Sequence, residues 1–202
     1  WADETAQRND ALDRLSHYDR VWVNDADEYY TRDAIEQILG YPAPIGVGVG
    51  MRTYWKTPEW RYEPADNWHP VVLLHPQRST FREYRDALAR ESFDYPDITM
   101  HHFSYVLTDA EAMRKMRSFS HASIVRPEWF EAWRMWQPGS AINICPWTSP
   151  PYVRAVHDPA PAEIQERYAN WQRIVDMHET LGDLGGRRRA TVAATAEQGG
   201  SR

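Results

Sequence analysis

Three carboxylates follow a short apolar run near the start of the sequence. Residues 21–23 (Val-Trp-Val) lead directly into Asp25, Asp27 and Glu28. Like charges this close repel one another, so the pattern predicts that a positive group holds them together. Two carboxylates at i and i+2 of an extended turn can face one hard cation, and Mg²⁺ and Mn²⁺ prefer oxygen ligands that they often share with substrate phosphates. The alternative interpretation is a solvated loop whose Asp residues cap the next helix.

The flanking residues place this acidic turn between a strand and a helix. A weak apolar stripe predicts a helix over residues 3–16, and the run at 21–24 is typical of a buried strand. Thr31 is a suitable N-cap for a second helix, and Gly40 is a suitable stop for it. In open α/β sheets, ligands bind beyond the carboxyl ends of the strands, which is where this turn is expected to lie.

The rest of the chain continues the mixture of strands and helices. We expect an α/β fold because strands alternate with helices over the first two thirds of the chain. Three glycines within the first of the later strands allow close approach of a ligand or another backbone, or packing under a helix. The predicted elements are strands at 43–55, 71–75 and 98–107, a loop at 57–69, helices beginning at the capping boxes Thr80/Glu83 (to Arg90) and Thr108/Glu111, and helices beginning at Pro127 and Pro161.

Composition excludes several classes of protein. The 202 residues suit one domain, and 42% hydrophobic content with 10 Trp and 11 Tyr is enough for a real core. A net charge of -6 disfavours nucleic acid as the main partner. We expect no transmembrane segment, because no apolar run reaches the roughly 18 residues that a span needs. The single cysteine, Cys145, cannot form an internal disulfide, which fits a reducing, cytoplasmic location.

Several catalytic motifs do not occur in the sequence. It contains no G-x-S-x-G motif and no P-loop, and "GVGVG" lacks the spacing of a dinucleotide-binding loop. Cys145 has no evident base beside it in the sequence. A metal-dependent phosphoesterase using the acidic turn usually needs two metals and denser His/Asp motifs.

Two segments resemble a known family. "ETAQRNDALDRLSHYDRVWVNDADEYY" is similar to the middle of GT-A glycosyltransferases of the family 2 type, in which a helix with an Arg-Asn pair precedes a strand and a D-x-D turn. Here the pair is Arg8-Asn9 and the turn is Asp25-Ala26-Asp27, extended by Glu28. "MHHFSYVLTDAEAMRKMRSFSHA" resembles a later segment of the family, in which a His-containing strand precedes a helix and a basic residue. The likeness covers about residues 1–158.

This resemblance implies a partial GT-A-like mixed sheet flanked by helices, and an activity. The expected function is metal-dependent transfer of a sugar from a nucleotide-diphospho-sugar donor to a glycan or other hydroxyl acceptor. The resemblance implies that Asp25 and Asp27 hold Mn²⁺ or Mg²⁺ on the donor diphosphate, with Arg8, Asn9 and Asp25 near the donor. An exposed helix face is the alternative for Arg8 and Asn9.

The resemblance also points to later site residues. Because neighbouring strand residues face opposite sides, only one of His101 and His102 is expected in the site, and we prefer His102 as a further metal ligand. A buried, hydrogen-bonded histidine is the alternative for each. Asp97 is the predicted general base, with Glu91 and Asp94 as competitors.

Two residues are predicted to line the acceptor pocket. They are His121 and Trp55, the latter as part of a sugar-stacking platform with Trp60 and Trp68. The alternative for His121 is a charge partner at a helix C-terminus, and for the tryptophans it is core packing.

The expected organisation is a glycosyltransferase-like core at 1–158, a C-terminal helix at 159–184 and a disordered tail at 185–202. The family's first strand and nucleotide-binding loop precede the Arg-Asn helix, so the likeness predicts an N-terminally incomplete piece of a longer enzyme. The alternative function is a non-catalytic carbohydrate-binding or scaffold domain derived from that fold.

Overall fold

The computed structural model describes residues 3–42, 46–65, 68–83, 85–89, 93–118, 122–142 and 153–173. The chain divides into two compact units, residues 1–160 and 161–202. In the second unit a helix covers residues 162–173 of the described part, as Pro161 predicts. The predicted tail at 185–202 lies outside the described residues.

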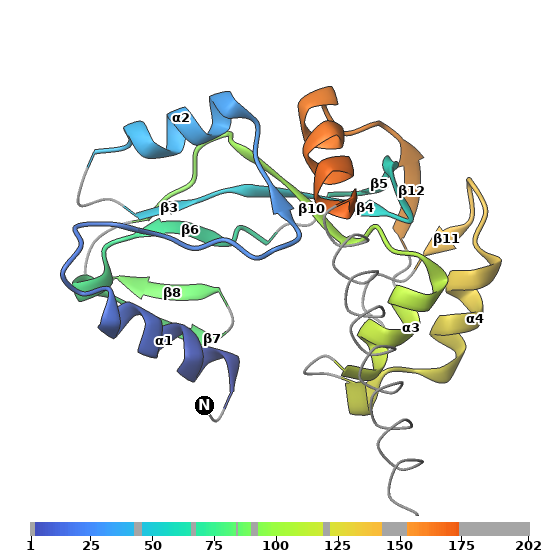
Figure 1. Cartoon of the computed structure of the whole chain (residues 1–202), viewed down its shortest axis with the longest axis horizontal. Helices are drawn as coiled ribbons and strands as arrows, with labels where there is room; N and C mark the ends of the chain where they lie inside the picture. Colours follow the sequence, from blue (N-terminus) through green and yellow to red (C-terminus); the bar gives the residue numbers. More distant parts are fainter. Residues whose placement is uncertain are drawn as a thin grey trace, which may run out of the picture. The chain divides into compact units, whose positions relative to one another are not determined.

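The first unit combines two sheets, a hairpin and four α-helices among its described residues (Figure 1). Its elements in chain order are α1 (Glu4–Arg14), β1 (Val21–Trp22), β2 (Glu28–Tyr29), α2 (Arg32–Gly40), β3 (Gly46–Gly48), β4 (Gly50–Trp55), β5 (Thr57–Glu63), β6 (Val71–Leu74), the 3₁₀ helix η1 (Pro76–Arg78), β7 (Ser79–Glu83), β8 (Asp86–Ala89), β9 (Phe93–Asp94), β10 (Thr99–Tyr105), α3 (Asp109–Ser118), the 3₁₀ helix η2 (Ala122–Ile124), α4 (Pro127–Met135), β11 (Ala141–Ile142) and β12 (Val153–His157).

Both larger sheets are mixed. One has the strand order β1-β6-β3-β9 and the other β11-β12-β5-β4-β10-β2, while β7 and β8 form a separate hairpin. β10 pairs with β4 in parallel and β3 pairs with β9 in parallel, whereas the remaining pairings are antiparallel. The predicted mixed α/β class is therefore confirmed. β10 is central to the site because it pairs with β4 on one side and with β2, which follows the acidic turn, on the other.

The helix predicted from Thr80 to Arg90 is wrong. The described residues of this segment form the β7–β8 hairpin instead, with Thr80 opposite Leu88 and Phe81 opposite Ala87. Phe81 and Ala87 are buried against α1, and this long-range burial outweighs the local capping signal. The loop predicted at 57–69 is also wrong over residues 57–63, which form β5 between β4 and β12.

Helix α2 follows β2, and side chains satisfy the backbone groups at both of its ends. The Thr31 hydroxyl accepts a hydrogen bond from the Ala34 N–H at 3.2 Å, as an N-cap should. At the other end, the Arg20 guanidinium donates to the carbonyls of Leu39 (3.1 Å) and Tyr41 (2.6 Å). These contacts satisfy carbonyls that the end of the helix would otherwise leave unpaired.

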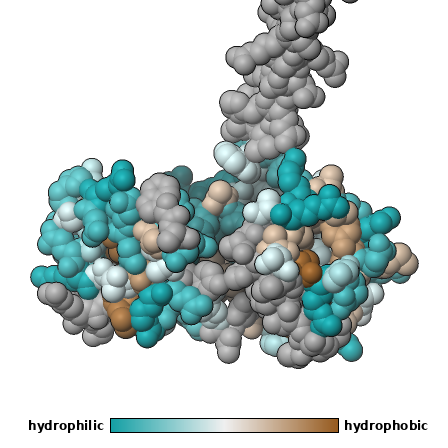
Figure 2. All heavy atoms as spheres, turned by 90° about the horizontal axis from the view of Figure 1, so that it is seen from below, coloured by the Kyte–Doolittle hydropathy of each residue, from teal (hydrophilic) through white to brown (hydrophobic). Residues whose placement is uncertain are grey.

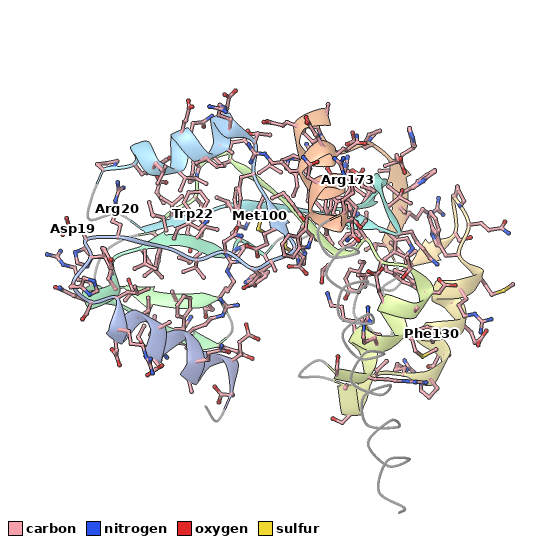
Figure 3. All side chains as sticks on the ribbon, viewed as in Figure 1. Asp19, Arg20, Trp22, Met100, Phe130 and Arg173 are labelled. Carbon is pink, nitrogen blue, oxygen red and sulfur yellow. The ribbon has the colours of Figure 1, made fainter. Side chains whose placement is uncertain are left out.

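Three apolar clusters hold the first unit together. α2 packs on one of them, which includes Met100 and is bordered by Trp22 (Figure 3). α1 and the hairpin share a second. The third is rich in tryptophan and joins β4 and β10 to α3 and α4. The glycines of β3 serve packing: a Cβ at Gly46 would collide with the Phe93 ring, and one at Gly48 with the Tyr95 ring.

The surface is largely polar where it can be seen. On the face in Figure 2, hydrophilic residues predominate among those coloured, and the hydrophobic ones are scattered. Within the described part of the chain, no helix combines the length and the apolar character needed to cross a bilayer.

Candidate functional site

The acidic turn is surrounded by basic side chains from α1, the hairpin and α3. The Arg8 Nη2 donates to both oxygens of Asp25, at 2.9 and 3.1 Å, and the Arg85 Nη1 lies 3.6 Å from the same carboxylate. The prediction that a positive group holds the acids together is therefore confirmed by cations of the chain itself. We call this group the strand-end cluster, and its members are Arg8, Asp25, Asp27, Glu28, Arg85, His102 and Lys115.

Glu28 and Arg85 form the buried base of the strand-end cluster. Their side chains are 4% and 2% exposed, and the Arg85 Nη1 donates to the Glu28 Oε1. The Arg85 Nη2 also donates to the carbonyls of Val23 (2.9 Å) and Val71 (3.2 Å), and the other Glu28 oxygen accepts from the Asp25 N–H at 3.1 Å. Burial raises the pKa of Glu28, and the charge of Arg85 opposes that rise. This pair ties the acidic turn to the hairpin and to β6.

Asp27 faces a different set of partners and keeps access to solvent. Its side chain is 37% exposed, with Oδ1 3.8 Å from the His102 Nε2 and Oδ2 3.5 Å from the Lys115 Nζ. Its backbone carbonyl accepts from the Phe103 N–H at 2.8 Å, which anchors the turn to β10. The two aspartates of the D-x-D turn therefore point to separate groups, Asp25 to arginines and Asp27 to histidine and lysine.

The orientation of His102 is set by β4. The His102 Nδ1 lies 3.2 Å from the hydroxyl of Thr53, which is buried, so the ring presents Nε2 to Asp27. Burial lowers the pKa of His102, although the Asp27 charge opposes this, and the ring is therefore neutral at pH 7. A neutral imidazole with one nitrogen held by a hydrogen bond is the form that binds metal ions.

Lys115, like Arg85, is a member of the cluster that sequence reasoning did not name. It lies on α3, and its Nζ donates to the Ser104 hydroxyl (2.5 Å) and the Ser104 carbonyl (2.8 Å) on β10. Burial lowers the pKa of Lys115, and Asp27 opposes the change. The available signal was its place in the helix after the His-containing strand, but only the packing of α3 on β10 brings it to Asp27.

Asn9 has a structural position that was not predicted. Its amide nitrogen donates to the Phe81 carbonyl at 3.0 Å, and its amide oxygen accepts from the Phe81 N–H at 2.8 Å and from the Thr80 hydroxyl at 3.2 Å. The side chain thus pairs with β7 as a neighbouring strand would. Arg8 joins the strand-end cluster, whereas Asn9 fastens α1 to the hairpin.

The other predicted site residues do not gather at the cluster. Trp55 is 2% exposed and packs edge-on against Trp133 with ring centroids 4.6 Å apart, so it belongs to the core and not to an acceptor pocket. Asp97 is exposed, and within the described ranges no hydrogen bond or ion pair joins it to the cluster. His121 and the competing base Glu91 lie outside the described residues.

The predicted three-ligand metal set is not assembled. In the part of the chain that the structure describes, no group of three or more His, Cys, Asp or Glu side chains could hold a metal ion. Asp25 is the residue that departs from the prediction, because its carboxylate is directed to Arg8 and Arg85. Asp27 and His102 lie together without it.

His101 lies apart from the cluster, as strand alternation predicts, and gives the fold a pH dependence. It is 4% exposed and its Nδ1 lies 2.9 Å from the Tyr54 hydroxyl. Burial, with a smaller effect from Arg52, lowers the pKa of His101 to about 4. Between pH 6.5 and 4 the unfolded chain therefore binds a proton that the native chain does not, and stability is lost as the pH falls through this window.

We expect this histidine to contribute a loss of about 2–3 kcal/mol in the free energy of unfolding between pH 7 and pH 4.5. Urea unfolding at both pH values measures it. The variant His101→Phe should lose less stability than the wild type over the same interval, because it carries no titrating ring. An equal loss in both proteins would contradict the assignment.

Comparison with known proteins adds no evidence about function, so the interpretation of the site rests on its geometry. No protein family, curated protein or solved structure matches the chain.

Proposed function

We propose that the strand-end cluster binds the diphosphate of a nucleotide-sugar together with a divalent cation, and that the function served is metal-dependent glycosyl transfer. The observation that carries the proposal is the half-exposed Asp27 carboxylate, set between a neutral histidine nitrogen and a lysine ammonium. The order of helix, strand, acidic turn and later His-containing strand supports the same class by resemblance.

Two of the residues present, Asp27 and His102, are suitable ligands for a divalent cation. The Asp27 carboxylate supplies oxygen and the His102 Nε2 supplies nitrogen, while Thr53 holds the opposite ring nitrogen. Mn²⁺ accepts both donor types, and Mg²⁺ takes the carboxylate with substrate phosphate oxygens. When bound, the cation would supply positive charge against the negative charge that develops on a departing nucleoside diphosphate.

The chain's own cations would act beside it. Lys115 holds its ammonium next to Asp27 through two hydrogen bonds to Ser104, so its charge is positioned before any ligand arrives. A preorganised donor of this kind interacts with a phosphate oxygen without first having to be reoriented. Arg8 keeps Asp25 engaged, which leaves Asp27 as the acid available to a ligand.

Replacing Asp27 with asparagine is expected to weaken Mn²⁺ binding by at least about tenfold, because the charged oxygen ligand is lost. Calorimetric titration of Mn²⁺ into the folded variant measures this. Asp97→Asn is the matched control, since Asp97 is exposed and makes no described contact with the cluster. Equal affinity of the wild type and Asp27→Asn would contradict the metal assignment.

An activity assay tests the other part of the proposal, the transfer of a sugar from a nucleotide-sugar donor. Release of nucleoside diphosphate from a panel of sugar nucleotides with Mn²⁺ should be seen with the natural full-length protein and lost in its Asp27→Asn and Lys115→Met variants. Metal binding without turnover of any donor would argue against the transferase.

One observation favours a non-catalytic carbohydrate-binding or scaffold domain as the second candidate. Arg8 and Arg85 neutralise Asp25 and Glu28, so the turn is stabilised by the chain's own cations without an added ion. Binding of glycans that is indifferent to chelator and unchanged in Asp27→Asn would support this candidate over the enzyme.

A further inference from the structure

A surface hollow lies between α3 and α4, away from the strand-end cluster. The two helices border a hollow of about 760 Å³. This volume falls within the range of about 300–1,000 Å³ that is usual for pockets that bind small molecules. The lining residues that matter here are Asp109, Met113, Arg114, Arg117, Phe130 and Arg134.

The charge of this hollow is positive although the chain as a whole is acidic. Three arginines and one aspartate line it, against a net charge of -6 for the chain. The aspartate is Asp109, whose carboxylate accepts from the Lys56 Nζ and from the Trp133 Nε1, both at 3.0 Å. These bonds lower the pKa of Asp109, so it stays ionised and engaged with its partners. The arginine charge is therefore only partly offset by the acid in the wall.

The arginines are placed to meet a ligand. Arg114 and Arg117 are exposed and lie three residues apart on α3, so they share one face of the helix. Arg134 comes from the last turn of α4, and its ion pair with Glu131 is long, at 3.6 Å, between two exposed side chains. Such a surface pair contributes little and is easily exchanged for an anion.

The remainder of the lining is apolar. Met113 on α3 and Phe130 on α4, which is labelled in Figure 3, are half-buried. Phe130 also packs against the tryptophan-rich cluster. Because these side chains are half-buried in the wall of an open hollow, a molecule lying in the hollow can cover them. Insertion into a bilayer calls instead for apolar side chains that project from the surface.

We propose that the hollow between α3 and α4 binds an anionic amphiphile, a phosphorylated or carboxylated organic molecule with an apolar body. The guanidinium groups would form charge-assisted hydrogen bonds to the anionic head, and the apolar body would cover Met113 and Phe130. The site is separate from the strand-end cluster, so this proposal stands independently of the proposed transferase activity.

Titration of the full chain with decyl phosphate, kept below its micelle concentration, tests the proposal by calorimetry. The double variant Arg117→Gln/Arg134→Gln should bind at least about tenfold more weakly, because two charge-assisted contacts are lost. Arg14→Gln/Arg82→Gln removes the same charge from exposed arginines elsewhere and should bind as the wild type does. Circular dichroism checks that each variant keeps its fold. Equal affinity of the Arg117→Gln/Arg134→Gln variant and the wild type would overturn the proposal.

Two further measurements separate the amphiphile from other ligands. Met113→Gln should weaken decyl phosphate binding and leave inorganic phosphate binding unchanged, because only the apolar contact is altered. If inorganic phosphate binds the wild type as tightly as decyl phosphate, the apolar lining has no role and the proposal fails. If the protein binds phosphatidylglycerol vesicles but does not bind monomeric decyl phosphate, the proposal is also overturned, in favour of a membrane-contacting surface.

Discussion

Replacing Arg85 with methionine should lower the free energy of unfolding by about 3–5 kcal/mol. The change leaves the Glu28 carboxylate in a site where it is 4% exposed, with its main positive partner removed. It also removes the donor to the carbonyls of Val23 and Val71. An unpaired buried charge is far more unfavourable than the loss of an ordinary hydrogen bond. Urea unfolding at pH 7 measures the effect.

The double variant Arg85→Met/Glu28→Leu separates the net contribution of the ion pair to the free energy of unfolding from the penalty of leaving Glu28 without a partner. If the loss in Arg85→Met comes from the stranded carboxylate, removing that carboxylate as well should restore much of the stability. Arg82→Met in the same hairpin is the control. Arg82 is 55% exposed and pairs with Asp86 at the surface, so its loss should matter by less than about 1 kcal/mol. Additive losses in the double variant would show that the ion pair is not the cause.

Replacing Trp133 with alanine should lower the free energy of unfolding by a similar amount, about 3–5 kcal/mol. Trp133 is fully buried, and its ring centroid lies 4.6 Å from that of Trp55 and 5.3 Å from that of Trp129. The Lys56 Nζ lies 4.4 Å from its ring centroid, and its Nε1 donates to Asp109. The substitution therefore opens a cavity and removes a hydrogen bond and a cation–π contact together.

Met135→Ala is the matched control on the same helix. Its side chain is largely exposed, at 74%, so the truncation should change stability by less than about 0.5 kcal/mol. Thermal unfolding followed by circular dichroism compares the two variants with the wild type. A Trp133→Ala protein as stable as Met135→Ala would mean that the core can close over the missing ring.

Elements with local start signals were predictable from the sequence. At α3, the Thr108 hydroxyl and the Glu111 carboxylate form the expected capping box, with the Thr108 N–H donating to Glu111 at 2.7 Å. Thr31 begins α2 in the same local way. Such signals are reliable where the residues that follow can bury a helical face.

The same kind of signal failed at Thr80 and Glu83, where partners distant in sequence decide the outcome. Phe81 pairs with Ala87 across the hairpin, and its backbone bonds to Asn9, 72 residues away. Pairing and burial of this kind cannot be read from a window of neighbouring residues, so the tertiary structure overrode the local preference.

For the candidate site, too, some features were determined by the sequence and others by the fold. The amino-acid sequence determined that three acids follow a short apolar strand and that positive charge must balance them, because like charges this close repel. It did not predict β2, the strand that holds Glu28 and separates the two aspartates from α2. It did not determine the partners: Arg85 meets Glu28 across 57 residues, and Thr53 meets His102 across 49. Only folding chose which carboxylates the two arginines engage and which one, Asp27, lies beside His102 and Lys115. The physical reason is that the energy of a charge depends on its burial and on its neighbours in space, and both are properties of the packed chain.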